Sequence, residues 1–406
     1  MKRFIYSLFP GSQPDKITAS LLFSCFFVGI AGAFTAPTMS LFISEEVGAR
    51  PFLIGVFFMV MIISGVVISQ VIGWWSDHGI DRKRLILVCN LMGAIGFIIF
   101  AFNRNYWVLL VCSAIFISTT SASVPQIFAL AREILDRSTK PSEKFSAVLR
   151  AQISLGWVIG PPIAFFIATG FGFTHLFLLA AVMFFLLCFI THRTLPSIEP
   201  TPKNPVEIED SLWKDKNIIL LSISFVFMYC SNNMYLISMP LYITNDLNMD
   251  SSVAGLMMGA AAFIEIPIML LCGSYATRFG KKRMIMASII AGMLFYVGII
   301  INTSLIGFIA LQALNGVFIG VTAALGISFF QDLKPKKMGQ VTTLYSNAIK
   351  TGGVLGGAFA GSIAEYFGFH AVFIVSGIMS VVAKSSKKTN LSRDYRLFMQ
   401  TRIHQF

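Results

Sequence analysis

Long runs of apolar residues, separated by short polar stretches, dominate this chain. Six runs lie in the first half, at residues 17–43, 52–75, 85–102, 106–130, 145–169 and 176–191. Six more follow a longer polar stretch, at residues 218–243, 253–276, 284–301, 304–330, 341–367 and 370–383. About 20 helical residues cross the hydrocarbon core of a bilayer. The pattern therefore predicts twelve membrane spans in two groups of six.

We expect every span to be a helix. A backbone facing lipid must satisfy its N–H and C=O groups internally, and the alternation typical of membrane β-strands is absent from the sequence. The first run is not followed by a small-residue cleavage pattern and a soluble domain, so we predict a retained span rather than a signal peptide. The predicted fold class is an all-α polytopic membrane protein.

The polar stretches divide the chain into four predicted segments. They are an N-terminal six-helix bundle at 1–191, a proline-rich cytoplasmic linker at 192–217, a C-terminal six-helix bundle at 218–383, and a basic polar tail at 384–406. The last apolar run is too short to cross about 30 Å of hydrocarbon in the usual way. We therefore predict a short last span and an altered terminus.

Composition and charge agree with a membrane protein. Hydrophobic residues make up 56% of the 406 residues and charged residues 12%, whereas a soluble domain carries roughly a quarter charged residues. With a cytoplasmic N-terminus, the basic clusters at 82–84 and 281–283 lie inside, and only Arg50 and Arg104 lie outside. This bias predicts that both termini are cytoplasmic, and it explains the net charge of +12 without a nucleic-acid partner.

The two groups of spans are related by an internal repeat. Four residues recur at one offset of about 200 positions: Gly55 and Gly255, Gly73 and Gly273, Arg150 and Lys350, and Gly156 and Gly356. Two parallel six-span repeats are typical of major facilitator carriers, whose substrate site lies near mid-membrane between the halves. We expect the same arrangement here.

Two loops carry a second repeated pattern of glycine and basic residues, with an acidic residue, Asp77, in the first copy and Thr277 in its place in the second. Its members are Gly73, Asp77 and Arg82 after the second run, and Gly273, Arg278, Gly280 and Lys281 after the eighth. Short cytoplasmic loops are often basic and glycine-rich, but two copies at matching positions favour a motif. The pattern resembles the loop signature of the major facilitator superfamily. The resemblance implies a contact that latches one conformation.

The fifth run contains Gly156, Gly160 and Pro161, followed by Pro162. Small residues four apart allow helices to approach closely, and the prolines remove two backbone donors, so we expect a bend. The run resembles the Gly-x-x-x-Gly-Pro motif of antiporters in this superfamily, which implies export. A purely structural kink is the alternative.

Three further stretches, at 149–162, 264–267 and 350–357, look like those of the bacterial sugar efflux transporter family. The resemblance covers residues 15–383. It implies proton-coupled efflux of lactose-like or glucose-like sugars across the bacterial inner membrane by alternating access. A multidrug/proton antiporter of the same fold is the alternative, but it would favour an acidic residue in the first or fourth span, and neither holds one before Glu133.

Charged residues deep in the spans are the candidates for proton coupling. They are Arg150, Glu265 and Lys350. Charges inside a membrane are costly and mark functional sites by default. Glu265 is the one deeply placed carboxyl group that can exchange a proton. The alternative is a fixed ion pair that only holds helices together.

Sugar recognition requires hydrogen-bonding side chains and flat apolar faces. The candidates are Gln126, Gln152, Trp157, Asn232, Asn233, Tyr235, Gln312, Asn315 and Asn347. For each one alone, an interhelical hydrogen bond or a packing role is the competing interpretation.

Other chemistry is weakly indicated by the sequence. The six cysteines lack CxxC spacing, the five histidines show no ligand pairing, and no phosphate-binding GxxxxGK[ST] occurs. We therefore expect no metal, no cofactor and no enzymatic activity. The expected partners are a small sugar, protons and the lipid bilayer, and we expect a monomer.

Overall fold

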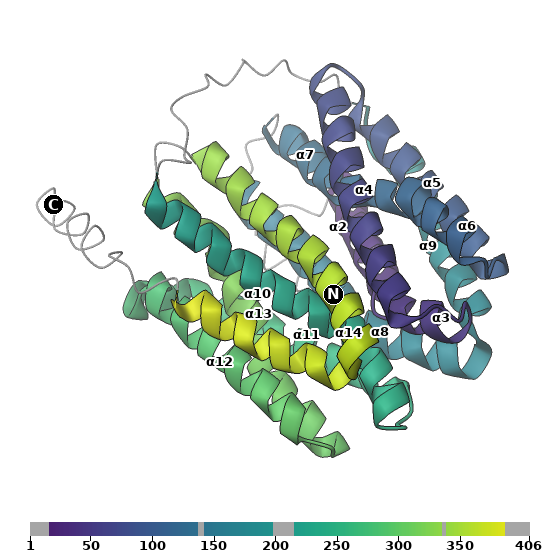
Figure 1. Ribbon diagram of the computed structural model, residues 1–406. Helices are drawn as coiled ribbons and strands as arrows, with labels where there is room; N and C mark the ends of the chain where they lie inside the picture. Colours follow the sequence, from purple (N-terminus) through teal and green to yellow (C-terminus); the bar gives the residue numbers. More distant parts are fainter. Residues whose placement is uncertain (1–15, 137–141, 198–214, 335–337, 386–406) are drawn as a thin grey trace, which may run out of the picture. The chain divides into compact units, whose positions relative to one another are not determined.

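The computed structural model describes residues 16–136, 142–197, 215–334 and 338–385, and all regular elements in these ranges are helical (Figure 1). The N-terminal helices are α2 (Lys16–Thr35), α3 (Met39–Glu45), α4 (Pro51–Asp77), α5 (Arg82–Phe102), α6 (Tyr106–Cys112), α7 (Ser123–Asp136), α8 (Ser142–Phe171) and α9 (Phe173–Thr194). The C-terminal helices are α10 (Lys216–Leu241), α11 (Ser252–Phe279), α12 (Lys281–Ile301), α13 (Leu305–Leu333) and α14 (Met338–Ser385).

Within the described residues, 11 helical stretches are long and apolar enough to cross a membrane. The last of them, Gln340–Ala383, has 44 residues and would be about 66 Å long as a straight helix, roughly twice the hydrocarbon thickness. It is interrupted at Gly368, whose backbone is not helical, with φ of 80°. Glycine adopts this left-handed φ at little cost, so the chain can turn here.

The two limbs of α14 run in opposite directions beside α10. Before Gly368, Gly352 lies against Val226 and Gly356 lies against Asn233. Residue numbers rise in the same direction on both helices, so this limb is parallel to α10. After Gly368, Phe373 contacts Tyr242 and Ser376 contacts Met234. Residue numbers now rise in opposite directions, so the second limb is antiparallel to α10. Figure 1 shows the limbs as separate rods, yellow-green and yellow. The second limb is helical as far as Ser385, slightly past the apolar run that the sequence predicts.

The fourth predicted span is not a uniform α-helix. It spans Tyr106–Ile134 and contains a π-helical stretch, Ser113–Ile117, and a 3-10 stretch, Thr120–Ala122. Four consecutive hydroxyl residues lie here, and two of them bond outside the helix, from Ser118 to the Met61 carbonyl at 2.8 Å and from Ser121 to the Gly65 carbonyl at 2.9 Å. Hydroxyls that compete for backbone groups favour such local changes of helix type.

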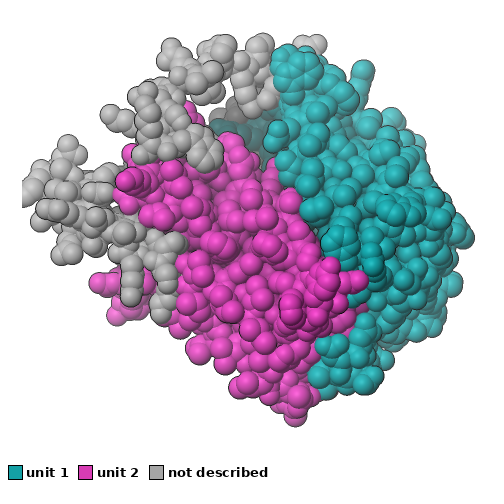
Figure 2. All heavy atoms as spheres, in the orientation of Figure 1, with its two compact units in different colours: residues 1–205, 243–262 teal, residues 206–242, 263–406 magenta. Residues whose placement is uncertain are grey.

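The chain forms two compact units (Figure 2). Unit 1 contains residues 1–205 and 243–262, and unit 2 contains residues 206–242 and 263–406. The start of α11 belongs to unit 1 because Gly255 and Gly259 lie against α8. A Cβ on Gly259 would lie 2.7 Å from Pro162, too close for any other residue without a shift. Most of the predicted linker and nearly all of the predicted tail lie outside the described residues.

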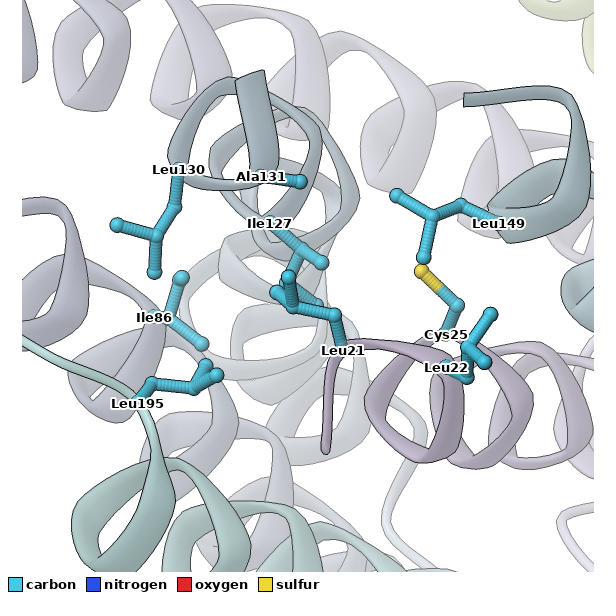
Figure 3. Packing of buried hydrophobic residues seen from close by; sticks show 9 residues of the cluster. All are labelled: Leu21, Leu22, Cys25, Ile86, Ile127, Leu130, Ala131, Leu149 and Leu195. Atoms are coloured by element: carbon cyan, nitrogen blue, oxygen red, sulfur yellow. The ribbon is translucent and has the colours of Figure 1, made fainter. Parts of the chain in front are cut away.

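Each unit has an apolar interior. In unit 1, side chains from α2, α5, α7 and α8 and from the residue that follows α9 meet in one cluster (Figure 3). Its members are Leu21, Leu22, Cys25, Ile86, Ile127, Leu130, Ala131, Leu149 and Leu195. In unit 2, aromatic rings pack in the interior: Tyr235 lies against Phe295, and Phe330 lies against Tyr345.

Candidate functional site

The three charged candidates lie on helices of both units. Arg150 on α8 is exposed, and its guanidinium carbon lies 5.9 Å from the centre of the Phe128 ring. Glu265 on α11 and Lys350 on α14 belong to unit 2 and are partly buried. Among the described residues of unit 2, ion pairs form at Lys281–Asp332 and Lys334–Asp215, and none joins Glu265 to Lys350.

The surroundings of Glu265 are narrow and include a tyrosine. A Cβ on Gly320 of α13 would lie 3.2 Å from the Glu265 carbonyl oxygen and 3.0 Å from Ile268, so the two helices are close here. Tyr229 on α10 lies within electrostatic range of the Glu265 carboxyl group. Its hydroxyl lies 3.2 Å from that of Tyr345 on α14.

Neither Tyr229 nor Tyr345 is among the residues that the sequence identifies. A signal for them exists in the repeat, because the positions 200 residues earlier hold Gly29 and Phe145, which carry no hydroxyl. The C-terminal repeat thus gains two polar groups that the N-terminal repeat lacks.

Several sugar candidates are buried and hydrogen-bonded to other protein groups. The Gln312 side-chain oxygen accepts bonds from the Tyr235 hydroxyl at 3.2 Å and from the Asn315 amide at 3.1 Å, and its amide donates to the Phe308 carbonyl at 3.0 Å. All three polar candidates are at most 4% exposed. They form an interhelical network inside unit 2.

The other candidates are more accessible. Gln152, Trp157, Asn232 and Asn233 are partly buried, and Asn347 is exposed. Asn233 donates a hydrogen bond to the Tyr229 carbonyl at 2.9 Å, one turn earlier on α10.

The glycines of α8 allow it to pack closely on α2. A Cβ on Gly156 would lie 2.5 Å from the Ile30 backbone nitrogen, and one on Gly160 would lie 2.5 Å from the Ala33 Cβ. The helix is continuous through Pro161 and Pro162. Close packing at these small residues agrees with the sequence prediction, and the bend stays a prediction.

The same contact recurs in unit 2. A Cβ on Gly356 of α14 would lie 2.7 Å from the Asn233 Cβ and 2.9 Å from the Cys230 carbonyl oxygen on α10. Gly356 and Gly156 are 200 residues apart, as are Cys230 and Ile30. The repeat is therefore structural as well as sequential.

In the first loop motif, Arg82 is buried at the start of α5 and bonds to two other helices. It donates to Glu133 at 2.7 Å and to Gln126 at 3.1 Å, both on α7, and to Ser76 on α4. Gln126, a sugar candidate, thus has an interior partner. A Cβ on Gly73 would have no atom within 4 Å. The side chain of Asp77 is not among those that the structure describes.

The second motif has a matching ion pair. Lys281 at the start of α12 lies 2.7 Å from Asp332 on α13. Arg82 to Lys281 and Glu133 to Asp332 are both offsets of 199 residues. Gly280, with φ of 84°, directly precedes α12. Arg278 is exposed, and its guanidinium carbon lies 5.5 Å from the centre of the Phe279 ring. The surroundings of Gly273 are not among those that the structure describes.

Comparison with known proteins assigns the family. The family model described as Major Facilitator Superfamily matches residues 21–223 and 221–384. Sugar efflux transporter A of Dickeya chrysanthemi is 43% identical over 364 residues, covering 89% of this chain and 93% of that protein. Sugar efflux transporter C of Escherichia coli (strain K12) is 41% identical, covering 90% and 93%. Multidrug resistance protein MdtG of Dickeya zeae is 22% identical, covering 88% and 90%.

Solved structures agree on the fold. The nucleoside transporter NupG (D323A mutant) has a TM-score of 0.81 at 15% identity, covering 91% of this chain and 98% of that chain. A bacterial homolog of the human lysosomal transporter Spinster has a TM-score of 0.75 at 12% identity, covering 94% and 99%. This multi-pass membrane protein therefore belongs to the Major Facilitator Superfamily and, within it, to the family of sugar efflux transporters.

Proposed function

We propose that this protein exports sugars from the bacterial cytoplasm across the inner membrane, driven by protons moving inward. The observation that carries the proposal is the 40–43% identity to four sugar efflux transporters along nearly the whole chain. The multidrug resistance proteins, at 21–24% identity, are much more distant. Sugars of the lactose and glucose type fit the proposal better than lipophilic drugs.

We assign proton exchange to Glu265, with Arg150 and Lys350 as the charges that respond to it. A carboxyl group couples a proton to transport only if it gains and loses that proton during the cycle. A permanent ion pair would hold the charged form of Glu265. Within the described part of unit 2, Lys350 lies beyond ion-pair distance of this carboxyl group. That geometry supports exchange over a fixed Glu265–Lys350 pair.

We assign sugar contacts to the accessible candidates. Gln152, Asn232, Asn233 and Asn347 offer amide groups for sugar hydroxyls, and Trp157 offers a flat apolar face. The proposal leaves out Gln126, Tyr235, Gln312 and Asn315, because these side chains are buried and bonded to protein groups.

The two loop ion pairs are assigned to the conformational cycle. Arg82–Glu133 and Lys281–Asp332 occupy equivalent places in the two repeats, each joining the start of one helix to a neighbouring helix. We propose that they stabilise one state of an alternating-access monomer with both termini in the cytoplasm. The cycle requires no covalent chemistry, cofactor or ATP.

Efflux from whole cells tests the choice of substrate. Cells that express the protein are loaded with labelled lactose, with labelled glucose or with ethidium, a lipophilic cation, and the loss of each compound is followed. We expect expression to accelerate lactose efflux and leave ethidium efflux unchanged. Faster ethidium efflux with unchanged efflux of lactose and glucose would favour the multidrug antiporter instead.

A further inference from the structure

The hydroxyl groups of Tyr229 and Tyr345 meet between two helices of unit 2. Their oxygens lie 3.2 Å apart, so one hydroxyl donates to the other. The Tyr345 ring is 8% exposed and packs against Phe225 and Phe330, with ring centres 5.6 Å and 5.5 Å away. This packing holds the Tyr345 hydroxyl against α10.

Helix α13 borders both the tyrosine pair and Glu265. A Cβ on Gly326 would lie 2.7 Å from the Tyr345 ring and 3.0 Å from its hydroxyl oxygen. Gly320, earlier on the same helix, faces the Glu265 backbone. A larger residue at either position would force a neighbour to shift, so α13 lies close to both the Tyr345 ring and the Glu265 backbone.

The second repeat alone carries this polar set. Residues 29, 65 and 145, each 200 positions earlier than Tyr229, Glu265 and Tyr345, are glycine, glycine and phenylalanine. The half that holds the proposed proton site therefore carries one carboxyl group and two hydroxyls that the first half lacks at the matching positions. If the tyrosine hydroxyls were only structural, they would not need to occur in the same repeat as Glu265.

We propose that Tyr229 and Tyr345 are positioning residues that hold the Glu265 carboxyl group for proton exchange. The inference rests on the proposed function. Either hydroxyl can donate to the other. In the arrangement that we propose, Tyr345 donates to the Tyr229 oxygen and the Tyr229 O–H donates to the ionised Glu265 carboxyl group. When Glu265 takes up a proton, it becomes the donor. Both tyrosines keep their own protons throughout, and the transported proton enters and leaves at Glu265.

The inference adds only the two tyrosine hydroxyls to the charges already assigned to proton coupling, Arg150 and Lys350. Helix α10 presents Tyr229, α14 carries Tyr345 and Lys350, and α13 presents Gly320. Loss of either hydroxyl should therefore affect proton coupling first. Sugar binding, which uses other side chains, should change little.

The test separates proton coupling from folding. Tyr229→Phe and Tyr345→Phe proteins are reconstituted in liposomes, and two rates are measured: sugar accumulation driven by an imposed pH gradient, and sugar-for-sugar exchange without a gradient. We expect accumulation to fall about tenfold, the scale of one hydrogen bond to a charged group, while exchange stays within about twofold. Tyr366→Phe on α14, whose side chain is 78% exposed, is the matched control and should match wild type.

Each other outcome contradicts the proposal. Equal losses of accumulation and exchange would indicate a structural role, and unchanged accumulation would indicate no role. If Tyr345→Phe does not fold, Tyr229→Phe and Gly326→Ala, which displaces the Tyr345 ring and keeps its hydroxyl, must show the same separation. If wild type itself fails to accumulate sugar, the proposed function is wrong and this inference falls with it.

Discussion

At the scale of single residues, Arg104, which the sequence predicts in an outer loop, has several local partners. Its guanidinium donates to the carbonyls of Phe100, Ala101 and Asn103, and it pairs with Glu46 at 2.6 Å. The last carbonyls of a helix have no partner within it, so this side chain completes the end of α5. With the predicted orientation, these local bonds stabilise a basic residue on the outer side.

Residue identity predicted which side chains are polar but not where they point. Gln152 and Gln312 are both glutamines within apolar runs, yet one is partly accessible and the other is fully buried with Tyr235. In a membrane helix, the positions that face lipid and those that face the protein interior are both apolar. The sequence therefore does not show which face of the helix points inward. Tyr229 and Tyr345 were missed for the same reason.

Asp215 gives a prediction that depends on pH. It caps α10 by accepting from the Asn217 and Ile218 backbone nitrogens, and it lies 2.8 Å from Lys334. Burial raises the pKa of Asp215, but the bonds with Lys334 and the backbone outweigh it and lower the pKa below its ordinary value. The stabilisation is therefore full above about pH 4 and is lost as pH falls through the lowered pKa.

We expect Asp215→Ala to lower the free energy of unfolding by about 1 kcal/mol at about pH 7, and by less near pH 3. Unfolding in detergent at the two pH values measures this difference. Asp215→Asn, which retains a capping oxygen, is the control and should lose less. A loss from Asp215→Ala that is equal at both pH values would contradict a role for the charge.

At the scale of helices, the two repeats use the same device to bring their helices together. Gly156 lets α8 contact the α2 backbone, and Gly356 lets α14 contact α10. The shared offset in the sequence predicted the repeat, and the spacing of Gly156 and Gly160 predicted close packing. The glycine spacing did not predict which helix is the partner, since any neighbouring helix with a small residue satisfies the same pattern.

Alanine at these glycines tests the contact. We expect Gly156→Ala and Gly356→Ala each to destabilise the protein by about 1–3 kcal/mol, because the added methyl group overlaps backbone or Cβ atoms of the partner helix. Gly32→Ala on α2 is the control, since nothing lies within 4 Å of its built Cβ, and it should be neutral or stabilising. Thermal unfolding in detergent checks all three, and equal melting temperatures would refute the packing role.

At the scale of the whole molecule, the helical class and the limits of the apolar helices were the most predictable features. Apolar length sets them directly, and the described helices follow the predicted runs closely. The break at Gly368 lies between the predicted runs 341–367 and 370–383. The changes of helix type in Tyr106–Ile134 were not predictable, because they depend on backbone bonding that apolar length does not encode.

The proposed orientation predicts the location of the linker. A reporter that is active only in the cytoplasm, fused after Glu209, should be active, because an even number of spans precedes it and the basic segments remain inside. The same reporter fused after Asn103, in a proposed outer loop, serves as the opposite control. Activity at Asn103 and none at Glu209 would reverse the orientation.

Transport by purified protein in liposomes with an imposed pH gradient tests the central claim, proton-driven sugar export through Glu265, most directly. Wild type should accumulate labelled sugar against its concentration gradient. Glu265→Gln keeps the size of the side chain and can still form hydrogen bonds, so it should fold and exchange sugar, yet fail to accumulate it. If Glu265 only stabilises the fold, stability and exchange should fall together with accumulation. Full proton-driven accumulation by a stable Glu265→Gln protein would contradict the account.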